Sequence, residues 1–80
     1  MYQVTTSKEG QSDIILNDVL VGHVRVDYDS RNYVWTVRKP SGHVLLIGQE
    51  PFGPDKKWNA TYFTRALDTC LKYVKKTYGD

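Results

Sequence analysis

The sequence predicts an α+β domain: an antiparallel β-meander of three to four strands with one C-terminal amphipathic helix packed on one face. Two observations support this fold class. Apolar residues recur at helical spacing near the C-terminus, and before them come short segments in which apolar and polar residues alternate between turn signals. A helix on one face of an antiparallel sheet buries the apolar side of both elements.

The helix is predicted over residues 58–79. Asn59 or Thr61 can accept hydrogen bonds from the unpaired N–H groups at its start. Gly79 can adopt the positive φ that ends a helix. The apolar residues fall on one stripe of a 3.6-residue helix, namely Phe63, Leu67, Cys70, Leu71, Val74 and Tyr78.

The clearest strand is predicted over residues 19–28, and residues 33–38 and 43–48 are predicted to continue the meander. A turn at residues 39–42 joins the last two, because it contains a proline followed by a glycine. Residues 2–6 can form an edge strand or a loose end. Alternation predicts that these side chains face the helix: Leu20, Val24, Val26, Tyr28, Tyr33, Trp35 and Val37.

The face of the sheet away from the helix is predicted to keep some apolar surface. Val34 has the same parity as Thr36 and Arg38, and residues 44–47 are apolar at both parities. Exposed apolar surface with a charged rim often marks a partner site. The alternative is that the N-terminal segment folds over this surface.

Composition predicts one domain over residues 1–80, with 40% hydrophobic and 25% charged residues. No apolar run approaches the roughly 20 residues of a membrane span, so we expect no membrane segment. The single cysteine excludes an internal disulfide and favours a cytoplasmic location. The net charge of +2 is uneven. Residues 1–29 carry two basic and five acidic groups, and residues 30–80 carry nine basic and four acidic groups. The positive half can attract an anionic partner, but a lysine-rich helix face in contact with water is the simpler interpretation.

The sequence contains no recognisable catalytic motif, and we expect neither enzymatic activity nor a cofactor. Cys70 lies on the apolar stripe, which is typical of a small core residue rather than a nucleophile. His23 and His43 could meet on adjacent strands, but two ligands without a spaced third do not define a metal site.

The chain from residue 33 to residue 48 (YVWTVRKPSGHVLLIG), followed by a helix that contains Ala66, resembles the arm-binding domains of phage integrases. Those domains bind DNA through a three-stranded sheet, and the resemblance implicates Arg25, Thr36 and Arg38. The chain departs from them in its preceding segment and in having no catalytic domain behind the helix. In size and organisation it is also similar to small phage-encoded accessory proteins, which often bind and inhibit a host protein.

We therefore expect a non-catalytic protein-binding module, of the kind that phages use to inhibit or modulate a host protein by covering its surface. Aromatic and arginine residues dominate binding energy at such interfaces. The predicted partner-binding residues are Arg31, Tyr33, Arg38, Lys39, Phe52 and Trp58.

Two alternatives stay open. Basic groups and aromatic rings are also what nucleic acid binds. For DNA binding through the sheet and basic loops, the predicted residues are Arg25, Thr36, Arg38, Lys39, Lys56 and Lys57. The other alternative is a homodimeric structural protein that pairs through an edge strand.

Overall fold

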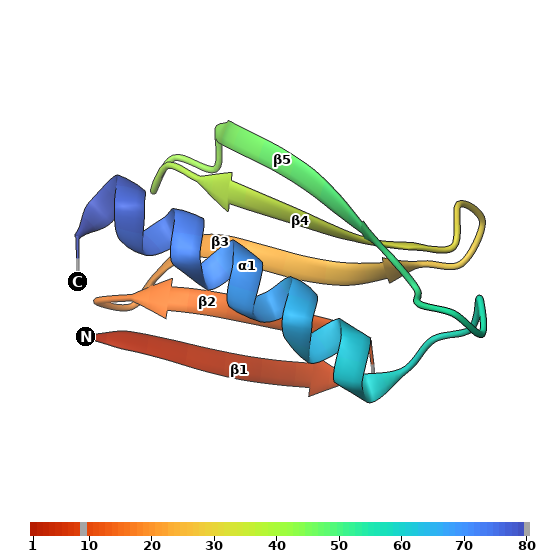
Figure 1. Ribbon diagram of the computed structural model, residues 1–80. Coiled ribbons are helices and arrows are strands. Elements are labelled where there is room, and N and C mark those ends of the chain that lie inside the picture. The colour runs from red at the N-terminus through yellow and green to blue at the C-terminus, as the bar shows by residue number, and fades with distance from the viewer. Residues whose placement is uncertain (9, 80) are drawn as a thin grey trace.

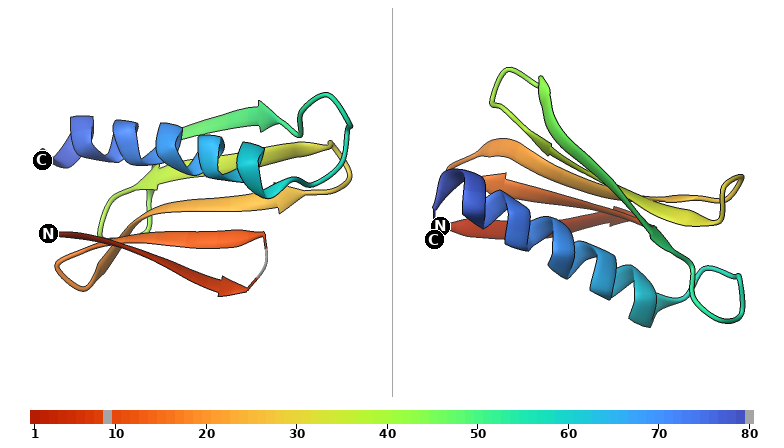
Figure 2. Two further views of the ribbon diagram at one scale, coloured as in Figure 1. Left: turned by 60° about the horizontal axis from the view of Figure 1, so that its bottom comes forward. Right: turned by 45° about the horizontal axis from the view of Figure 1, so that its top comes forward.

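The computed structural model describes residues 1–8 and 10–79 and shows five strands followed by one helix (Figure 1). The elements are β1 (Tyr2–Lys8), β2 (Gln11–Leu16), β3 (Val19–Asp27), β4 (Asn32–Arg38), β5 (Val44–Pro51) and α1 (Ala60–Tyr78). Each strand pairs antiparallel with the next, in the order β1-β2-β3-β4-β5. The helix lies on one face of this meander and leaves the other face uncovered (Figure 2), which confirms the α+β class.

The predicted number of strands, three to four, is too low. Residues 11–16 form a complete strand that pairs with β3, and β1 pairs with it in turn. The apolar run of residues 14–16 is too short to indicate this strand by itself. The turn after it is formed by Asn17 and Asp18, which adopt positive φ values of 50° and 69°. Asn and Asp tolerate this conformation, so a tight hairpin returns the chain directly into β3.

A β-bulge in β3 changes the predicted orientation of one residue. Ile14 pairs with Gly22 but Ile15 pairs with Leu20, so Val21 is the extra residue. Leu20 therefore lies on the face opposite to Gly22, and the prediction that it faces the helix is wrong. Val21 itself is buried. A bulge shifts the alternation of side chains by one position, and single-strand parity cannot detect it.

The core lies between the helix and the centre of the sheet. Tyr33, Trp35 and Val37 of β4 are buried, as their parity predicts. Tyr28, predicted to share this face, follows the end of β3 and is exposed. From the helix the core receives Phe63, Ala66, Cys70 and Val74. Leu67, Leu71 and Tyr78 of the predicted stripe flank this core and are partly buried.

The helix begins two residues later than predicted, at Ala60. Asn59 is its N-cap, and its side-chain oxygen accepts hydrogen bonds from the backbone N–H groups of Thr61 (2.8 Å) and Tyr62 (3.4 Å). Trp58 precedes the helix and packs against the core. Gly79 ends the helix with φ 92°, and its N–H donates to the carbonyl of Lys75 at 2.7 Å.

The two ends of the chain lie at the same end of the molecule (Figure 1). The hydroxyl of Tyr2 donates to the carbonyl of Gly79 at 2.5 Å. The hydroxyl of Tyr78 donates to the carbonyl of Arg38, at the end of β4. No helix in the part of the chain that the structure describes is both long enough and apolar enough to cross a membrane.

Candidate functional site

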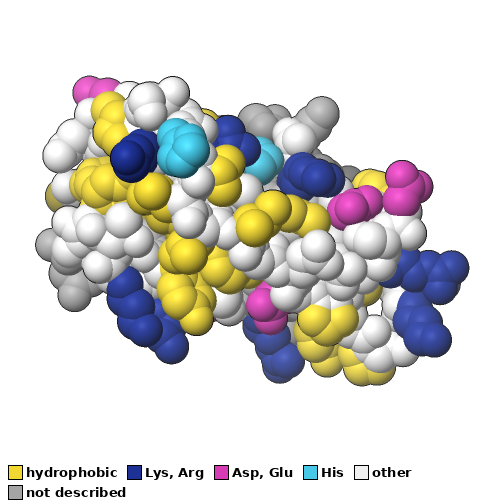
Figure 3. All heavy atoms as spheres, turned by 90° about the horizontal axis from the view of Figure 1, so that it is seen from above, with side chains coloured by type: hydrophobic (Ala, Val, Ile, Leu, Met, Phe, Trp, Pro, Cys, Tyr) yellow, Lys and Arg dark blue, Asp and Glu magenta, His cyan; other side chains and the backbone are white. Residues whose placement is uncertain are grey.

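The most distinctive surface of the molecule is the outer edge of β5, where consecutive apolar side chains are exposed. The exposed fractions are 43% for Val44, 38% for Leu45, 42% for Leu46 and 67% for Ile47. We call these four residues the apolar edge. Figure 3, which views the sheet from the β5 side, shows hydrophobic side chains gathered there.

On the face of the sheet away from the helix, which we call the open face, the exposed apolar side chains lie at the β5 edge, with Ile47 the most exposed. Val34, in the middle of that face, is only 8% exposed. The N-terminal segment does not fold over the apolar edge, because it forms β1 at the opposite side of the sheet.

The two edge strands differ in character. In β1 the exposed side chains are mostly polar, including Gln3, Thr5 and Thr6, and its register is interrupted between Thr5 and Lys8. In β5 no charged residue occurs between Val44 and Gln49. Proteins usually protect edge strands with charges, prolines or irregular pairing, because a regular apolar edge is a template for another strand. Polar side chains thus prevail among the exposed residues 3–6 of β1, whereas the first four residues of β5 are all apolar.

Local sequence positions the start of β5. The turn before it is closed by hydrogen bonds from Gly42 N to Lys39 O (2.8 Å) and from Lys39 N to His43 O (2.9 Å). Gly42 has φ 95°, which a glycine adopts without strain. A bulge follows, since Val37 pairs with Leu46 but Arg38 pairs with Val44. Leu45 is the extra residue. The pairing of β5 with β4 is therefore irregular at Val44 and Leu45 and regular from Leu46 onward.

The border of the apolar edge on the helix side is a stack of aromatic rings. Gly48 of β5 pairs with Trp35, whose indole fills the space that a side chain at residue 48 would need. Tyr73 of α1 stacks on Trp35, with ring centroids 5.2 Å apart and planes at 13°. The ammonium group of Lys76 lies 5.3 Å from the centroid of Tyr73. A cation thus lies above the helix-side border.

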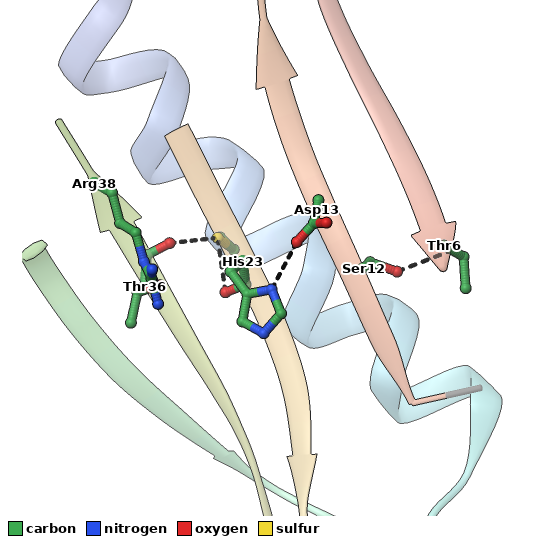
Figure 4. Close-up of polar contacts among 7 residues, drawn as sticks. Thr6, Ser12, Asp13, His23, Thr36 and Arg38 are labelled. Atoms are coloured by element: carbon green, nitrogen blue, oxygen red, sulfur yellow. Dashed lines mark hydrogen bonds and ion pairs between the residues drawn. The ribbon is translucent and has the colours of Figure 1, made fainter. Parts of the chain in front are cut away.

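The border on the open face is polar. Ile47 pairs with Thr36, and the hydroxyl of Thr36 accepts a hydrogen bond from Nε of Arg38 at 3.1 Å (Figure 4). One strand further, Nδ1 of His23 lies 2.7 Å from a carboxylate oxygen of Asp13. This contact orients the imidazole, and it lies two strands away from the apolar edge.

Of the residues predicted to contact a protein partner, two are core residues. Tyr33 and Phe52 are almost completely buried, and their rings pack together at a centroid distance of 5.1 Å. The hydroxyl of Tyr33 accepts from Asn59 N (2.9 Å) and donates to Asn59 O (3.1 Å), so this ring fastens the helix start to the sheet. Both residues therefore leave the candidate set. Trp58 is half-buried.

The remaining predicted contact residues lie apart. Arg31 is exposed in the β3–β4 turn, where it has φ 58°. Arg38 and Lys39 lie at the other end of the sheet, before the turn into β5. The apolar edge was not among the predicted site residues. The sequence feature that could have identified it is that residues 44–47 are apolar at both odd and even positions.

The residues predicted for DNA binding are partly brought together. Arg25, Thr36 and Arg38 share the open face on β3 and β4, since Arg25 pairs with Val34 and Thr36 with His23. Asp13 shares this face and reduces its positive potential. The other three, Lys39, Lys56 and Lys57, are exposed in the turn before β5 and in the connection to α1.

The chemistry available to Cys70 is limited. The thiol is buried and donates to the backbone carbonyls of Thr36 (3.5 Å) and His23 (4.0 Å). Burial raises the pKa of this thiol from 9.0 to about 11, which keeps it protonated at neutral pH. Among the described residues, no three His, Cys, Asp or Glu side chains are grouped so that they could hold a metal ion.

The comparisons with known proteins give no relative. No protein family, no curated protein and no solved structure matches this chain. The similarity to phage accessory proteins and to integrase domains stays a prediction. The surface itself is the basis for a functional proposal.

Proposed function

We propose that this chain is a small non-catalytic protein-binding module, acting as a phage-type modulator that covers part of its partner, and that the partner docks on the apolar edge. The observation that carries this proposal is the exposure of four consecutive apolar side chains on an edge strand, up to 67% at Ile47. Contiguous exposed apolar surface is rare on proteins that bind nothing.

An edge strand offers two kinds of contact at once. Its outward backbone N–H and C=O groups can pair with an added strand, and its side chains add apolar contact on both faces of the new pair. Leu46 pairs with Val37 on the helix side, and Ile47 pairs with Thr36 on the open face. A partner strand beside β5 would cover both residues.

The state of the single cysteine supports a proposal of binding without catalysis, because a buried, protonated thiol is a poor nucleophile. Cys70 is buried between the helix and the sheet and is held protonated. His23 is engaged by Asp13 on the open face. The proposal therefore depends on contact area and not on a reactive group.

The test is a pull-down from nuclease-treated bacterial lysate with the tagged chain, Ile47→Lys, Leu46→Lys and Val4→Lys. Val4 is the matched control, because it is 44% exposed on the opposite edge strand, while Leu46 is 42% exposed. We expect a stoichiometric protein to be retained by the wild type and Val4→Lys and lost by both β5 variants. Retention by all four proteins would refute the proposal.

DNA binding through the open face is the second candidate, since Arg25 and Arg38 lie on the same face of adjacent strands. The aromatic rings of Tyr33 and Trp35, however, point into the core and cannot stack on bases. Fluorescence anisotropy with duplex DNA separates the candidates. Phosphate contacts would make the affinity fall steeply between about 50 and 200 mM salt and would be weakened by Arg25→Ala and Arg38→Ala.

A further inference from the structure

Positive charge borders the apolar edge on both faces. On the helix side, Lys76 lies over Tyr73, which stacks on Trp35 beside Gly48. On the open face, Arg38 pairs with Val44 at the start of β5. Figure 3 shows Lys and Arg side chains on both sides of the hydrophobic group.

The two ends of β5 differ in charge. Before its first residue the chain carries the exposed and positively charged Lys39. Glu50, near its last residue, pairs with Tyr33 and places a negative charge at the other end of the same strand. Residues 44–47 thus have Arg38 and Lys39 at their start and Lys76 on the helix side, and the one acidic residue of β5 lies at its other end. An added strand would meet these cations at its own flanks.

We propose that β5 recognises an extended segment of a partner protein in which apolar residues are flanked by Asp or Glu. This inference rests on the proposed function and assigns the chemistry of its partner. The apolar residues of the segment would cover Leu46 on the helix side and Ile47 on the open face. Its acidic residues would lie beside Arg38 and Lys76, at the end of the segment that meets the start of β5.

A second copy of the chain fits this edge less well. Its own β5 carries the same cations. A parallel pair of β5 strands would bring Arg38 of both copies together, and an antiparallel pair would set Arg38 and Lys39 of each copy against the single Glu50 of the other, so positive charge stays in excess at the seam. Like charges at such a seam oppose association. Charge complementarity therefore favours a partner of opposite charge over self-pairing.

The test is selection of a random peptide library, displayed on phage, against the immobilised full chain. We expect enriched peptides with alternating apolar residues and Asp or Glu on at least one flank. Ile47→Lys should weaken their binding at least about tenfold, as for a central contact residue. Val4→Lys should leave binding unchanged and serves as the matched control. Circular dichroism verifies that each variant is folded.

Charge reversal tests the flanks separately. Lys76→Glu and Arg38→Glu should each weaken acidic-flanked peptides by about two- to fivefold, the size expected for exposed ion pairs. A repeated selection against the double variant should favour Lys or Arg at the flanks. Peptides without a flank preference, or with basic flanks on the wild type, would overturn the inference.

The remaining outcomes are also decisive. A selection that yields no peptide dependent on Ile47 overturns the inference, and the proposed function then stands or falls by the lysate experiment. The last measurement is sedimentation equilibrium of the chain alone, which gives its oligomeric state. A dimer that is lost in Ile47→Lys and kept in Val4→Lys would overturn the inference in favour of a second copy.

Discussion

Trp35 and Gly48 face each other across β4 and β5 in such a way that the indole occupies the place of a side chain at residue 48. A Cβ atom built on Gly48 would lie 2.1 Å from Cζ2 and 2.3 Å from Cε2 of Trp35. On its other side the indole is stacked by Tyr73 of α1. The glycine thus lets β5 lie close to the core while its neighbours Leu46 and Ile47 stay exposed.

The first prediction is that Gly48→Ala destabilises the fold. The new methyl group must displace Trp35, which is held by Tyr73, and overpacking of this kind costs about 1–3 kcal/mol. Gly42→Ala is the control, because nothing lies within 4 Å of a Cβ atom there and only its φ of +95° opposes the change. Urea denaturation measures both variants. The near-ultraviolet circular dichroism of Trp35 should change in Gly48→Ala and stay unchanged in Gly42→Ala.

The second prediction concerns Cys70 and alkaline pH. Burial raises the pKa of its thiol to about 11 in the folded state, from 9.0 for the unburied group. The folded state therefore holds this proton more tightly, and the resulting stability is complete below pH 9 and is lost as the pH rises towards 11. At about pH 10.5 the loss should be about 2 kcal/mol.

The control for this titration is Cys70→Ala, which removes the thiol and keeps the other alkaline groups. The free energy of unfolding is measured for both proteins in urea, with reductant present, at about pH 8 and about pH 10.5. The wild type should lose more stability than Cys70→Ala between the two pH values. Equal losses would mean that the thiol is no harder to ionise in the folded protein.

The helix could be predicted from sequence because its signals are local. Its apolar stripe, its N-cap at Asn59 and its ending at Gly79 each depend on residues within a few turns. The sheet depends on pairing between distant segments. The bulge at Val21 arises from the register of β3 against β2, and the strand character of residues 11–16 arises from the same pairing. No pattern within one strand contains that information.

The candidate site could be predicted only in outline. The apolar character of residues 44–47 is visible in the sequence, but the position of β5 at the edge of the sheet is a property of strand order. Aromatic rings were predicted as contacts because of their type. Tyr33 and Phe52 are nevertheless buried, since they join the sheet to the start of the helix.

The third prediction separates the two proposed helix caps. Asn59→Ala removes the oxygen that accepts from Thr61 N and Tyr62 N, and loss of an N-cap costs about 0.5–2 kcal/mol. Thr61 is exposed in the first turn of the helix and is not the cap, so Thr61→Ala should change the free energy of unfolding by no more than about 0.5 kcal/mol. Urea denaturation of the two variants distinguishes them. A larger effect at Thr61 would contradict the cap geometry.

The fourth prediction tests whether the apolar edge is open in the isolated chain. Ile47 and Val37 are both β-branched residues of the sheet, but Ile47 is 67% exposed and Val37 is fully buried. Replacement by threonine places a hydroxyl in water at residue 47 and in the core at residue 37. We expect Ile47→Thr to change the free energy of unfolding by at most about 0.5 kcal/mol and Val37→Thr to lower it by about 1–3 kcal/mol.

Urea denaturation at several protein concentrations gives both values and shows whether either depends on association. A cost at Ile47 as large as that at Val37, independent of concentration, would mean that β5 is packed within the chain. The apolar edge would then have no surface to offer a partner. A small cost at Ile47, together with loss of binding in Ile47→Lys, would assign this side chain to recognition rather than to stability.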